Sequence, residues 1–181
     1  VFSRPEASRR LLDEITALIK ETPETGLHLD VEVFDVVPEA EVANFRQFLA
    51  KLRQSMREPR KRVLTAFVPL TSGLYGPDEY ALLDGMVVQG YDAHWAESPK
   101  TGPVSLLEEE GSSVAWKQAG AKLTQAGVAK ERIFFSSPLF GYEWPTETDA
   151  PRAPTRGAGL TITFAPVPSA LLPDLRINAL M

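Results

Sequence analysis

The segment from Val63 to Val68 is an almost unbroken run of apolar residues, and it lies between two stretches with helical periodicity. A strand that is buried on both faces has this composition, and such strands are typical of parallel sheets that helices cover. Three more segments have strand character, namely Leu27 to Phe34, Met86 to Tyr91 and Ile133 to Phe135. A chain that alternates helix and strand in this way is predicted to form a parallel sheet with its helices outside.

The helices between these strands are predicted from apolar residues that recur at helical spacing. The first helix follows Ser3-Arg4-Pro5-Glu6, which has the pattern of a capping box. In that motif the Ser3 hydroxyl and the Glu6 carboxylate each accept a hydrogen bond from a backbone amide. Later apolar stripes predict helices at residues 42–56 and 114–126, and residues 78–82 are predicted to form at most a short helix.

Two fold classes accommodate this order of elements, a doubly wound sheet and a (β/α)8 TIM barrel. Four strands supply about half of such a barrel, and a full barrel needs about 200 residues or more, whereas this chain has 181. The tail departs from the alternating pattern. Residues 146–156 are interpreted as a loop, and Leu160 to Phe164 as an edge or hairpin strand.

Composition and charge exclude several classes of function. The net charge is −5 and the sequence has no basic stripe with interleaved aromatic residues, so a nucleic-acid-binding surface is not expected. The chain has no cysteine, which excludes disulfides, thiolate nucleophiles and cysteine-bound zinc. No apolar run approaches the roughly 20 residues that a membrane-spanning helix needs.

The sharpest cluster of reactive side chains is His28-Leu29-Asp30-Val31-Glu32. Because strand side chains alternate between faces, His28, Asp30 and Glu32 would point the same way from a strand that we expect to be buried. The two acids would lie roughly 7 Å apart, and their pKa values can then separate so that one carboxyl stays protonated and acts as an acid. Two alternatives remain, which are ion pairs with Arg or Lys of neighbouring strands and a metal site formed by the three side chains.

Two further segments place polar and aromatic side chains after later strands. The segment from Gln89 to Trp95 contains a tyrosine, a carboxylate and a tryptophan, which suit sugar binding because they offer hydrogen bonds beside an apolar face. Phe140 to Trp144 follows the fourth strand, and Gly141 would allow a sharp turn there. Tyr142 and Trp144 would either line a groove or cover the rim of the barrel. Trp116 lies on a helical stripe and is interpreted as a core residue.

Taken together, these three segments resemble glycoside hydrolase family 18, the family of chitinase-like barrels. Its fourth strand carries the signature D-G-x-D-x-D-x-E, and the stretch Thr25 to Glu32 keeps the last Asp and the Glu but has Thr25 and His28 at the other acidic places. Its sixth strand ends M-x-Y-D, where this chain has Gln89-Gly90-Tyr91-Asp92. Its seventh strand has G-x-P-x-Y-G-x-x-W, which residues 136–144 follow with two substitutions and with an ending similar to the branch of spore-germination peptidoglycan glucosaminidases.

The resemblance covers residues 1–145 and implies an α/β fold of the (β/α)8 TIM-barrel type. The barrel would be partial, beginning just after the third strand and holding about strands four to seven. Residues 1–181 would then form a single glycosidase-like fragment, with residues 146–181 as a loop and insertion-like tail. The resemblance also favours a secreted or cell-envelope location.

The resemblance implies a glycoside hydrolase that cleaves β-1,4-linked N-acetylglucosamine polymers, chitin or peptidoglycan, by a substrate-assisted retaining route. Glu32 would protonate the leaving oxygen, Asp30 would orient the acetamido group and stabilise the oxazolinium intermediate, and Tyr91 would hydrogen-bond the acetamido oxygen. Neither a metal nor an organic cofactor is needed. The further substrate-binding residues that the resemblance implies are Asp92, Gln89, His28, Trp95, Tyr142 and Trp144.

Three other functions stay open from the sequence. A non-catalytic carbohydrate-binding relative of the same fold would usually lack the acid, whereas Glu32 is present. A metal-dependent hydrolase would use His28, Asp30 and Glu32 as ligands and would respond to a chelator. A purely structural α/β domain would use the same side chains only for stability, because a fold alone does not fix a function.

Overall fold

The computed structural model describes residues 1–23, 25–57 and 61–163, which belong to two compact units. The first unit comprises Val1–Ala93 and Ser105–Ser137, and the second comprises His94–Val104 and residues 138–163, each as far as the structure describes it. Phe164, with which the last predicted strand ends, lies outside the described residues. Within these ranges, no helix combines the length and the apolar character needed to cross a bilayer.

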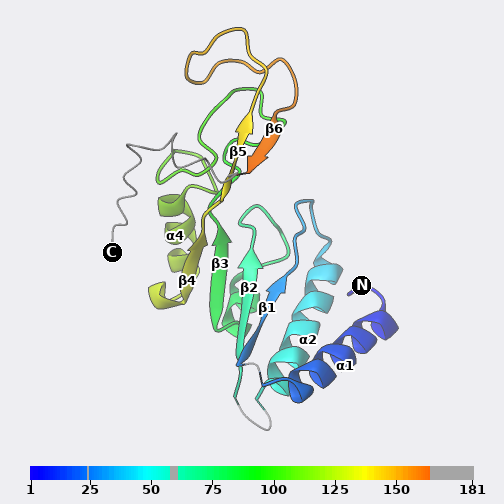
Figure 1. Ribbon diagram of the computed structural model, residues 1–181. Coiled ribbons are helices and arrows are strands. Elements are labelled where there is room, and N and C mark those ends of the chain that lie inside the picture. The colour runs from blue at the N-terminus through cyan, green and yellow to red at the C-terminus, as the bar shows by residue number, and fades with distance from the viewer. Residues whose placement is uncertain (24, 58–60, 164–181) are drawn as a thin grey trace. The chain divides into compact units, whose positions relative to one another are not determined.

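The first unit is built on a parallel sheet of four strands in the order β1-β2-β3-β4 (Figure 1). The predicted parallel pairing is confirmed for each pair of neighbouring strands. The strands are β1 (Gly26–Asp30), β2 (Val63–Val68), β3 (Gly85–Gln89) and β4 (Ile133–Ser136). The helices that alternate with them are α1 (Pro5–Glu21), α2 (Glu39–Ser55), α3 (Pro77–Leu82) and α4 (Trp116–Gln125), and a short 3-10 helix, Lys130–Arg132, precedes β4.

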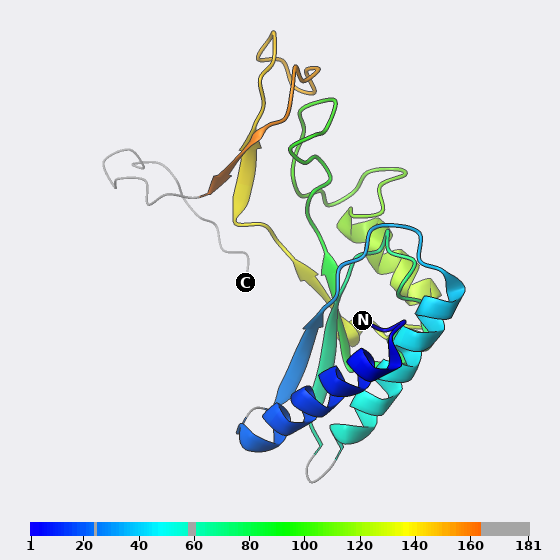
Figure 2. The ribbon, with the colours of Figure 1, turned by 90° about the vertical axis from the view of Figure 1, so that its right-hand side faces the viewer.

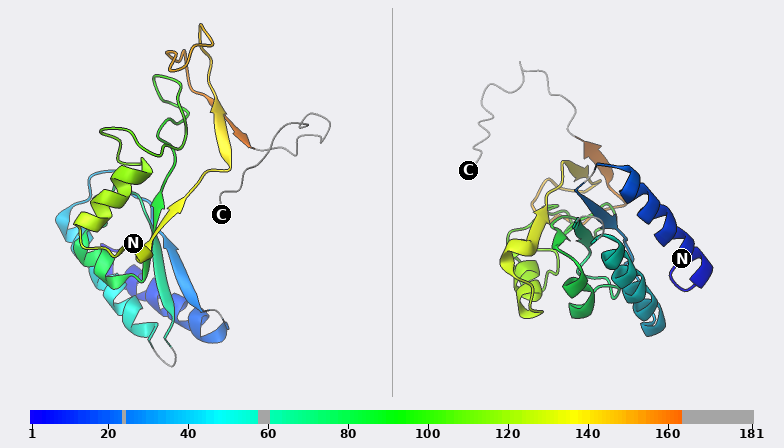
Figure 3. Two further views of the ribbon diagram at one scale, coloured as in Figure 1. Left: turned by 90° about the vertical axis from the view of Figure 1, so that its left-hand side faces the viewer. Right: turned by 90° about the horizontal axis from the view of Figure 1, so that it is seen from below.

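The helices of the first unit lie along one face of its sheet, as Figure 2 shows from the side and Figure 3 from below. Strand residues that point to this face alternate with residues that point away from it. In the wall of a TIM barrel, helices likewise cover the outer face and the other strand face turns to the interior. The core between sheet and helices includes Leu29, Leu64, Ala66, Val68, Met86 and Val88 from the strands and Phe45, Leu49, Leu52 and Leu123 from the helices.

The other face of β1 is open, so the prediction of a buried strand from Leu27 to Phe34 is wrong. Leu29 is the one buried residue of β1, whereas His28, Asp30 and Glu32 are exposed. The ladder to β2 ends where Asp30 pairs with Phe67, and Pro69 has no N–H with which to extend it. The alternation of polar and apolar residues therefore belongs to a strand that is covered on one face only.

The start of α1 also differs from the predicted capping box. Pro5 occupies the first turn of the helix, Arg4 is the N-cap residue, and no side chain makes a capping hydrogen bond. Ser3 therefore precedes the cap, and Glu6 stands at the second helical position, whereas the reciprocal bond of a capping box needs the third. The fixed φ of Pro5 suits the first turn, so proline defines this helix start without a serine cap.

The second unit contains β5 (Phe140–Glu143) and β6 (Leu160–Thr163), which pair antiparallel as a hairpin. The hairpin prediction for the segment from Leu160 is thereby confirmed as far as Thr163. The sharp turn predicted at Gly141 is wrong, because this glycine pairs with Ile162 inside β5. Residues 146–156 form the predicted loop, and an isolated bridge joins Thr146 to Thr155.

A partly buried ion pair ties α2 to the sheet near the beginnings of β2 and β3. The guanidinium of Arg53 donates two hydrogen bonds to Asp84, one of 2.6 Å from Nη2, and the Leu64 N–H donates to the same carboxylate at 2.8 Å. Burial acts to raise the pKa of Asp84, but the hydrogen bonds from Arg53 and Leu64 and the charges of Arg53 and Lys61 outweigh burial and leave this pKa below its ordinary value. One carboxylate thus fixes α2, β2 and the start of β3 together.

We expect Asp84→Asn to lower the free energy of unfolding by about 1 to 3 kcal/mol near neutral pH, because it leaves the Arg53 charge without its anionic partner. The folded-state pKa of Asp84 is depressed, so this stabilisation is present above the unfolded pKa and is lost as the pH falls through the folded one. Urea unfolding at neutral and at acidic pH measures both effects.

The matched control for this prediction is Arg10→Gln, which breaks the exposed Arg10–Glu14 pair on α1. Exposed pairs are screened by water, so this change should have much the smaller effect. Equal losses of stability in the two variants, or a loss in Asp84→Asn that persists unchanged in acid, would contradict the assignment.

Candidate active site

Two carboxyls stand where β1 ends. Asp30 is its last residue and Glu32 follows two residues later, and a hydrogen bond joins the two side chains. Partial burial is the largest cause that raises the pKa of Glu32, and the charge of Asp30, the bond to Asp30 and the charge of Asp92 raise it further. Glu32 therefore holds its proton more tightly than an isolated glutamic acid does.

Tyr91 and Asp92 follow the end of β3 and approach the same two carboxyls. The Tyr91 ring lies 6.3 Å from the Phe67 ring between centroids, with 35° between their planes. Burial raises the pKa of Tyr91, and the charges of Glu32, Asp92 and Asp30 raise it further. Asp92 has a φ of 61°, in the left-handed region that non-glycine residues seldom adopt. Three acids and one phenol, contributed by the ends of two strands, thus meet in the first unit.

Gln89 is the last residue of β3 and is buried. The sheet register pairs Asp30 with Phe67 and Phe67 with Val87. Gln89 lies two residues beyond Val87, so it shares the sheet face of Asp30. The register therefore brings a side-chain amide to the same end and the same face of the sheet as the two acids.

His28 lies on that face as well, two residues before Asp30 in β1. Its Nδ1 is 2.8 Å from Oγ1 of Thr65, the residue that it pairs with on β2. This bond fixes one ring nitrogen of the exposed imidazole. Among residues 1–23, 25–57 and 61–163, no three His, Cys, Asp or Glu side chains are grouped as a metal ion would need. A metal site formed by His28, Asp30 and Glu32 is therefore not preformed in these residues.

The remaining predicted residues, Trp95, Tyr142 and Trp144, belong to the second unit. Along β5 the ring of Tyr142 lies 5.6 Å from that of Phe140 and 5.6 Å from that of Trp144, measured between centroids. The Trp144 indole N–H donates to the carbonyls of Trp95 and Ala96, at 3.1 and 3.2 Å. Trp95 is 52% exposed. Phe140 extends this row of rings, and the spacing of two along a strand is the signal that identifies it.

Trp116 is not the core residue that its helical stripe predicted. It is only partly buried, its ring stacks on Phe135 at 5.1 Å with 12° between the planes, and its indole N–H donates to the Gly90 carbonyl at 3.1 Å. Ser105 donates to the same carbonyl. No sequence pattern connects these two side chains to Gly90, because the contacts join a loop, a helix and a strand end.

Tyr75, in the loop between β2 and α3, is a further group near Asp30, and no sequence pattern predicts it. It is 6% exposed, and its hydroxyl has no hydrogen-bond partner among the described residues. Burial raises its pKa most, and the charge of Asp30 contributes next. Its ring contacts Phe45 edge-on at 5.3 Å. An isolated tyrosine in a loop of Gly, Leu and Ser gives no periodic signal by which to predict this position.

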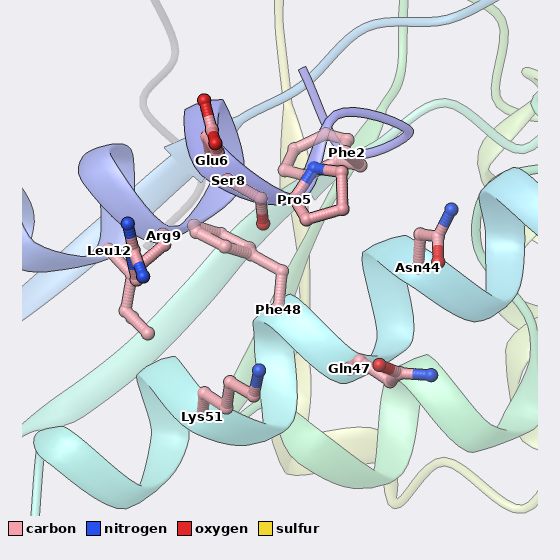
Figure 4. Close-up of a pocket in the computed structure, with 10 residues that line it drawn as sticks. All are labelled: Phe2, Pro5, Glu6, Ser8, Arg9, Leu12, Asn44, Gln47, Phe48 and Lys51. Atoms are coloured by element: carbon pink, nitrogen blue, oxygen red, sulfur yellow. The ribbon is translucent and has the colours of Figure 1, made fainter.

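A separate hollow of about 310 Å³ lies between the start of α1 and α2 (Figure 4). The rings of Phe2 and Phe48 line it together with Arg9 and Lys51. It is formed by helices, which cover the face of the sheet opposite to that of Asp30. The hollow is therefore separate from the cluster of Asp30, Glu32 and Asp92.

We expect Asp30→Asn to lower the pKa of Glu32 toward its ordinary value, because it removes the nearest negative charge. Asp92→Asn should lower it less, since Asp92 is the smallest of the contributing causes. NMR titration of labelled glutamate side-chain carboxyls measures both shifts. Asp35→Asn, an exposed residue beyond Glu32, is the control and should leave the Glu32 titration unchanged. A larger shift in Asp92→Asn than in Asp30→Asn would contradict the arrangement.

Comparison with known proteins identifies the family of this chain. The model of the family described as Glycosyl hydrolases family 18 matches residues 1–166. YdhD of Bacillus subtilis, named as a candidate sporulation-specific glycosylase, is 29% identical over 152 residues, which are 80% of this chain and 33% of YdhD. Its crystal structure superposes with a TM-score of 0.69 at 26% identity, over 90% of this chain and 52% of that one.

Chitinases supply two further similar structures. A family GH18 chitinase from Cycas revoluta, solved as a complex with allosamidin, has a TM-score of 0.74 at 26% identity, over 87% of this chain and 50% of that one. A class V chitinase from Nicotiana tobaccum has a TM-score of 0.76 at 21% identity, over 90% and 53%, and so supports the fold alone. The chain spans about half the length of these solved relatives and a third of the curated one. Its fold is thus α/β of the TIM-barrel type, and the chain belongs to glycosyl hydrolase family 18.

Proposed function

We propose that this protein is a glycosidase that hydrolyses β-1,4-linked N-acetylglucosamine polymers, chitin or peptidoglycan, by substrate-assisted retaining catalysis. The observation that carries the proposal is the hydrogen-bonded pair Asp30–Glu32, in which the pKa of Glu32 is raised, beside Tyr91 and Asp92. Family membership supports the class of reaction. The Cycas revoluta chitinase has been solved with (GlcNAc)3 and with (GlcNAc)4, which supports the class of substrate.

Glu32 is the proton donor in this proposal. A general acid must hold its proton at the working pH and release it to the leaving oxygen in the transition state, and a raised carboxyl pKa serves that need. When the glycosidic bond breaks, Glu32 gives its proton to the departing sugar oxygen. The resulting carboxylate then takes a proton from the water that attacks the anomeric carbon, so the residue returns to its starting state.

Asp30 supports the attack by the substrate's own acetamido group. The acetamido oxygen bonds to the anomeric carbon as the leaving group departs, and the oxazolinium intermediate carries a positive charge. A carboxylate fixed two residues from Glu32 places a negative charge where this positive charge develops. The same charge raises the pKa of Glu32, so one residue both stabilises the intermediate and keeps the acid protonated.

The other polar residues orient the sugar. A tyrosine hydroxyl is protonated near neutral pH, and the raised pKa of Tyr91 favours this form further, so the hydroxyl can donate a hydrogen bond to the acetamido oxygen. Asp92 and Gln89 are assigned to sugar hydroxyls or to the bent acetamido group. His28, held by Thr65, offers its second ring nitrogen to the bound sugar or to Asp30.

Aromatic rings supply the platforms on which the sugar rings stack. Tyr142 and Trp144 stand in a row along β5, and the hydrogen bonds of Trp144 hold its ring in place. Trp95 has an exposed indole face. A pyranose presents an apolar face of C–H groups, so a flat apolar ring beside hydrogen-bonding groups recognises it. This mechanism requires no metal and no organic cofactor.

Glu32→Gln is expected to lower kcat on a chromogenic N-acetylglucosamine oligomer by about 100- to 10 000-fold, with a much smaller change in KM. Glutamine keeps the size and the hydrogen-bonding capacity of the side chain but cannot release a proton. Steady-state kinetics of the purified protein, with and without a metal chelator, measure the effect. The chelator should change neither kcat nor KM.

Glu41→Gln is the matched control, because Glu41 is an exposed glutamate on α2, and its kcat should equal that of the unaltered protein. Unchanged turnover in Glu32→Gln would refute the assigned acid. A folded protein that binds the oligomer and never cleaves it would favour a non-catalytic carbohydrate-binding function. Loss of activity with chelator would favour a metal-dependent hydrolase.

A further inference from the structure

The carbonyl of Gly90 accepts two side-chain hydrogen bonds immediately before the Tyr91–Asp92 pair. The Ser105 hydroxyl donates to it at 2.5 Å and the Trp116 indole N–H at 3.1 Å. The C=O of Gly90 and the N–H of Tyr91 belong to the same planar peptide unit. Fixing this oxygen at two points therefore fixes the plane from which the Tyr91 side chain departs.

Both donors are themselves held in position. The Trp116 ring stacks on Phe135 of β4, and the backbone N–H groups of Trp116 and Lys117 donate to the carbonyls of Leu106 and Leu107. These bonds close the loop that contains Ser105 onto the start of α4. The two donors thus reach Gly90 from a loop and a helix whose relative placement is fixed by backbone hydrogen bonds.

The space around Gly90 accepts no side chain. A Cβ at this position would lie 2.4 Å from Nε1 of Trp116 and 2.5 Å from the carbonyl oxygen of Ser136, and both distances are below any real Cβ contact. The close approach of Trp116 therefore depends on glycine here. The Ser136 hydroxyl of β4 also donates a hydrogen bond to the Val88 carbonyl of β3 at 2.8 Å. This bond ties the end of β3 to β4.

The residues after Gly90 need such a restraint. Asp92 has a φ of 61°, a strained backbone conformation for a residue with a side chain. Tyr91 and Asp92 also lie beside Asp30 and Glu32, and the negative charge of Asp92 is repelled by Asp30 and, whenever it is ionised, by Glu32. Strain and repulsion persist only where the surrounding structure over-determines the conformation.

We propose that Trp116 and Ser105 are positioning residues of the candidate active site, which hold the Gly90 carbonyl and thereby set the place of Tyr91 and Asp92 against Glu32. The inference deepens the proposed function and rests on it. Trp116 and Ser105 are not assigned to the sugar, but they would set the positions of Tyr91 and Asp92, which are. Neither residue has a counterpart in the sequence motifs of the site.

The test compares Trp116→Phe and Ser105→Ala, singly and together, with the unaltered protein. Phenylalanine keeps a ring to stack on Phe135 and removes only the N–H donor. The first readout is the NMR titration of the Glu32 carboxyl in the absence of substrate. We expect its pKa to fall toward the ordinary glutamate value, because Asp92 retreats and its charge acts less on Glu32.

The second readout is steady-state kinetics on the N-acetylglucosamine oligomer. The double variant should lose about tenfold in kcat with a smaller change in KM, because the misplaced groups act on the transition state more than on the bound sugar. A residue with a merely structural function would lower the melting temperature and leave the Glu32 titration in place.

Two controls make the result decisive. Ser105→Thr keeps the hydroxyl, so its Glu32 titration and its kcat should match those of the unaltered protein. If Trp116→Phe does not fold, the comparison of Ser105→Ala with Ser105→Thr still tests the proposal. Thr124→Val removes a hydroxyl-to-carbonyl bond of the same kind, 2.7 Å to Gly120 on α4, and should alter neither readout.

A folded double variant with an unchanged Glu32 titration would overturn the proposal, as would an equal shift in Thr124→Val. The titration needs no substrate, so it answers even if the unaltered protein cleaves no oligomer. Failure of the proposed function would show as an inactive but folded unaltered protein, whereas failure of the positioning would show only in the Glu32 titration of the variants.

Discussion

The candidate site depends on the common direction of the strands. Because β1, β2 and β3 are parallel, their carboxyl ends lie along one edge of the sheet, and residues just beyond those ends come together although they are far apart in the chain. Asp30 and Glu32 reach this edge from β1, and Tyr91 and Asp92 reach it from β3. Alternation along each strand then selects the face, so the helices cover one side and the carboxyls occupy the other.

The two ends of the sheet serve different needs. Near the beginnings of β2 and β3, Arg53 neutralises Asp84 and the charges there favour the folded state. At the other end, partial burial and the charges of Asp30 and Asp92 raise the pKa of Glu32, which means that ionising Glu32 there opposes folding. Such a cluster persists only on a rigid support. The core under β1 to β4 and the bonds to the Gly90 carbonyl provide this support, and the protein thereby concentrates its unfavourable electrostatics where chemistry can use it.

Much of the fold can be predicted from the periodicity of apolar residues, because each strand must bury the side chains on the face that the helices cover. Val63 to Val68 is apolar except for Thr65, and its strand was predicted with the bounds that the structure gives. The exposed face of β1 was not foreseen, since three polar side chains at spacing two fit both a functional row in a buried strand and a strand with one open face. The start of α1 depended on which of two adjacent residues takes the cap, and local propensity alone does not decide that.

The candidate site likewise has residues that sequence patterns predict and residues that only the folded structure reveals. Alternation predicted that Asp30 and Glu32 share one face, and the segment from Gln89 to Trp95 pointed to Tyr91 and Asp92, all from local patterns. The contacts of Trp116 with Gly90 and the burial of Tyr75 near Asp30 depend on how a loop and a helix pack against strand ends. No spacing in the sequence encodes such contacts, and they became visible only once the elements were assembled.

The most direct test of this account is the anomeric configuration of the first product. Proton NMR, recorded as the protein begins to cleave an N-acetylglucosamine oligomer, distinguishes the β from the α anomer before they equilibrate. Attack by the acetamido oxygen, followed by water, gives two inversions, so the account predicts the β anomer. Initial release of the α anomer would mean direct attack by water with a second carboxylate as base, and would contradict the assignment of Asp30 and Glu32 to a substrate-assisted mechanism.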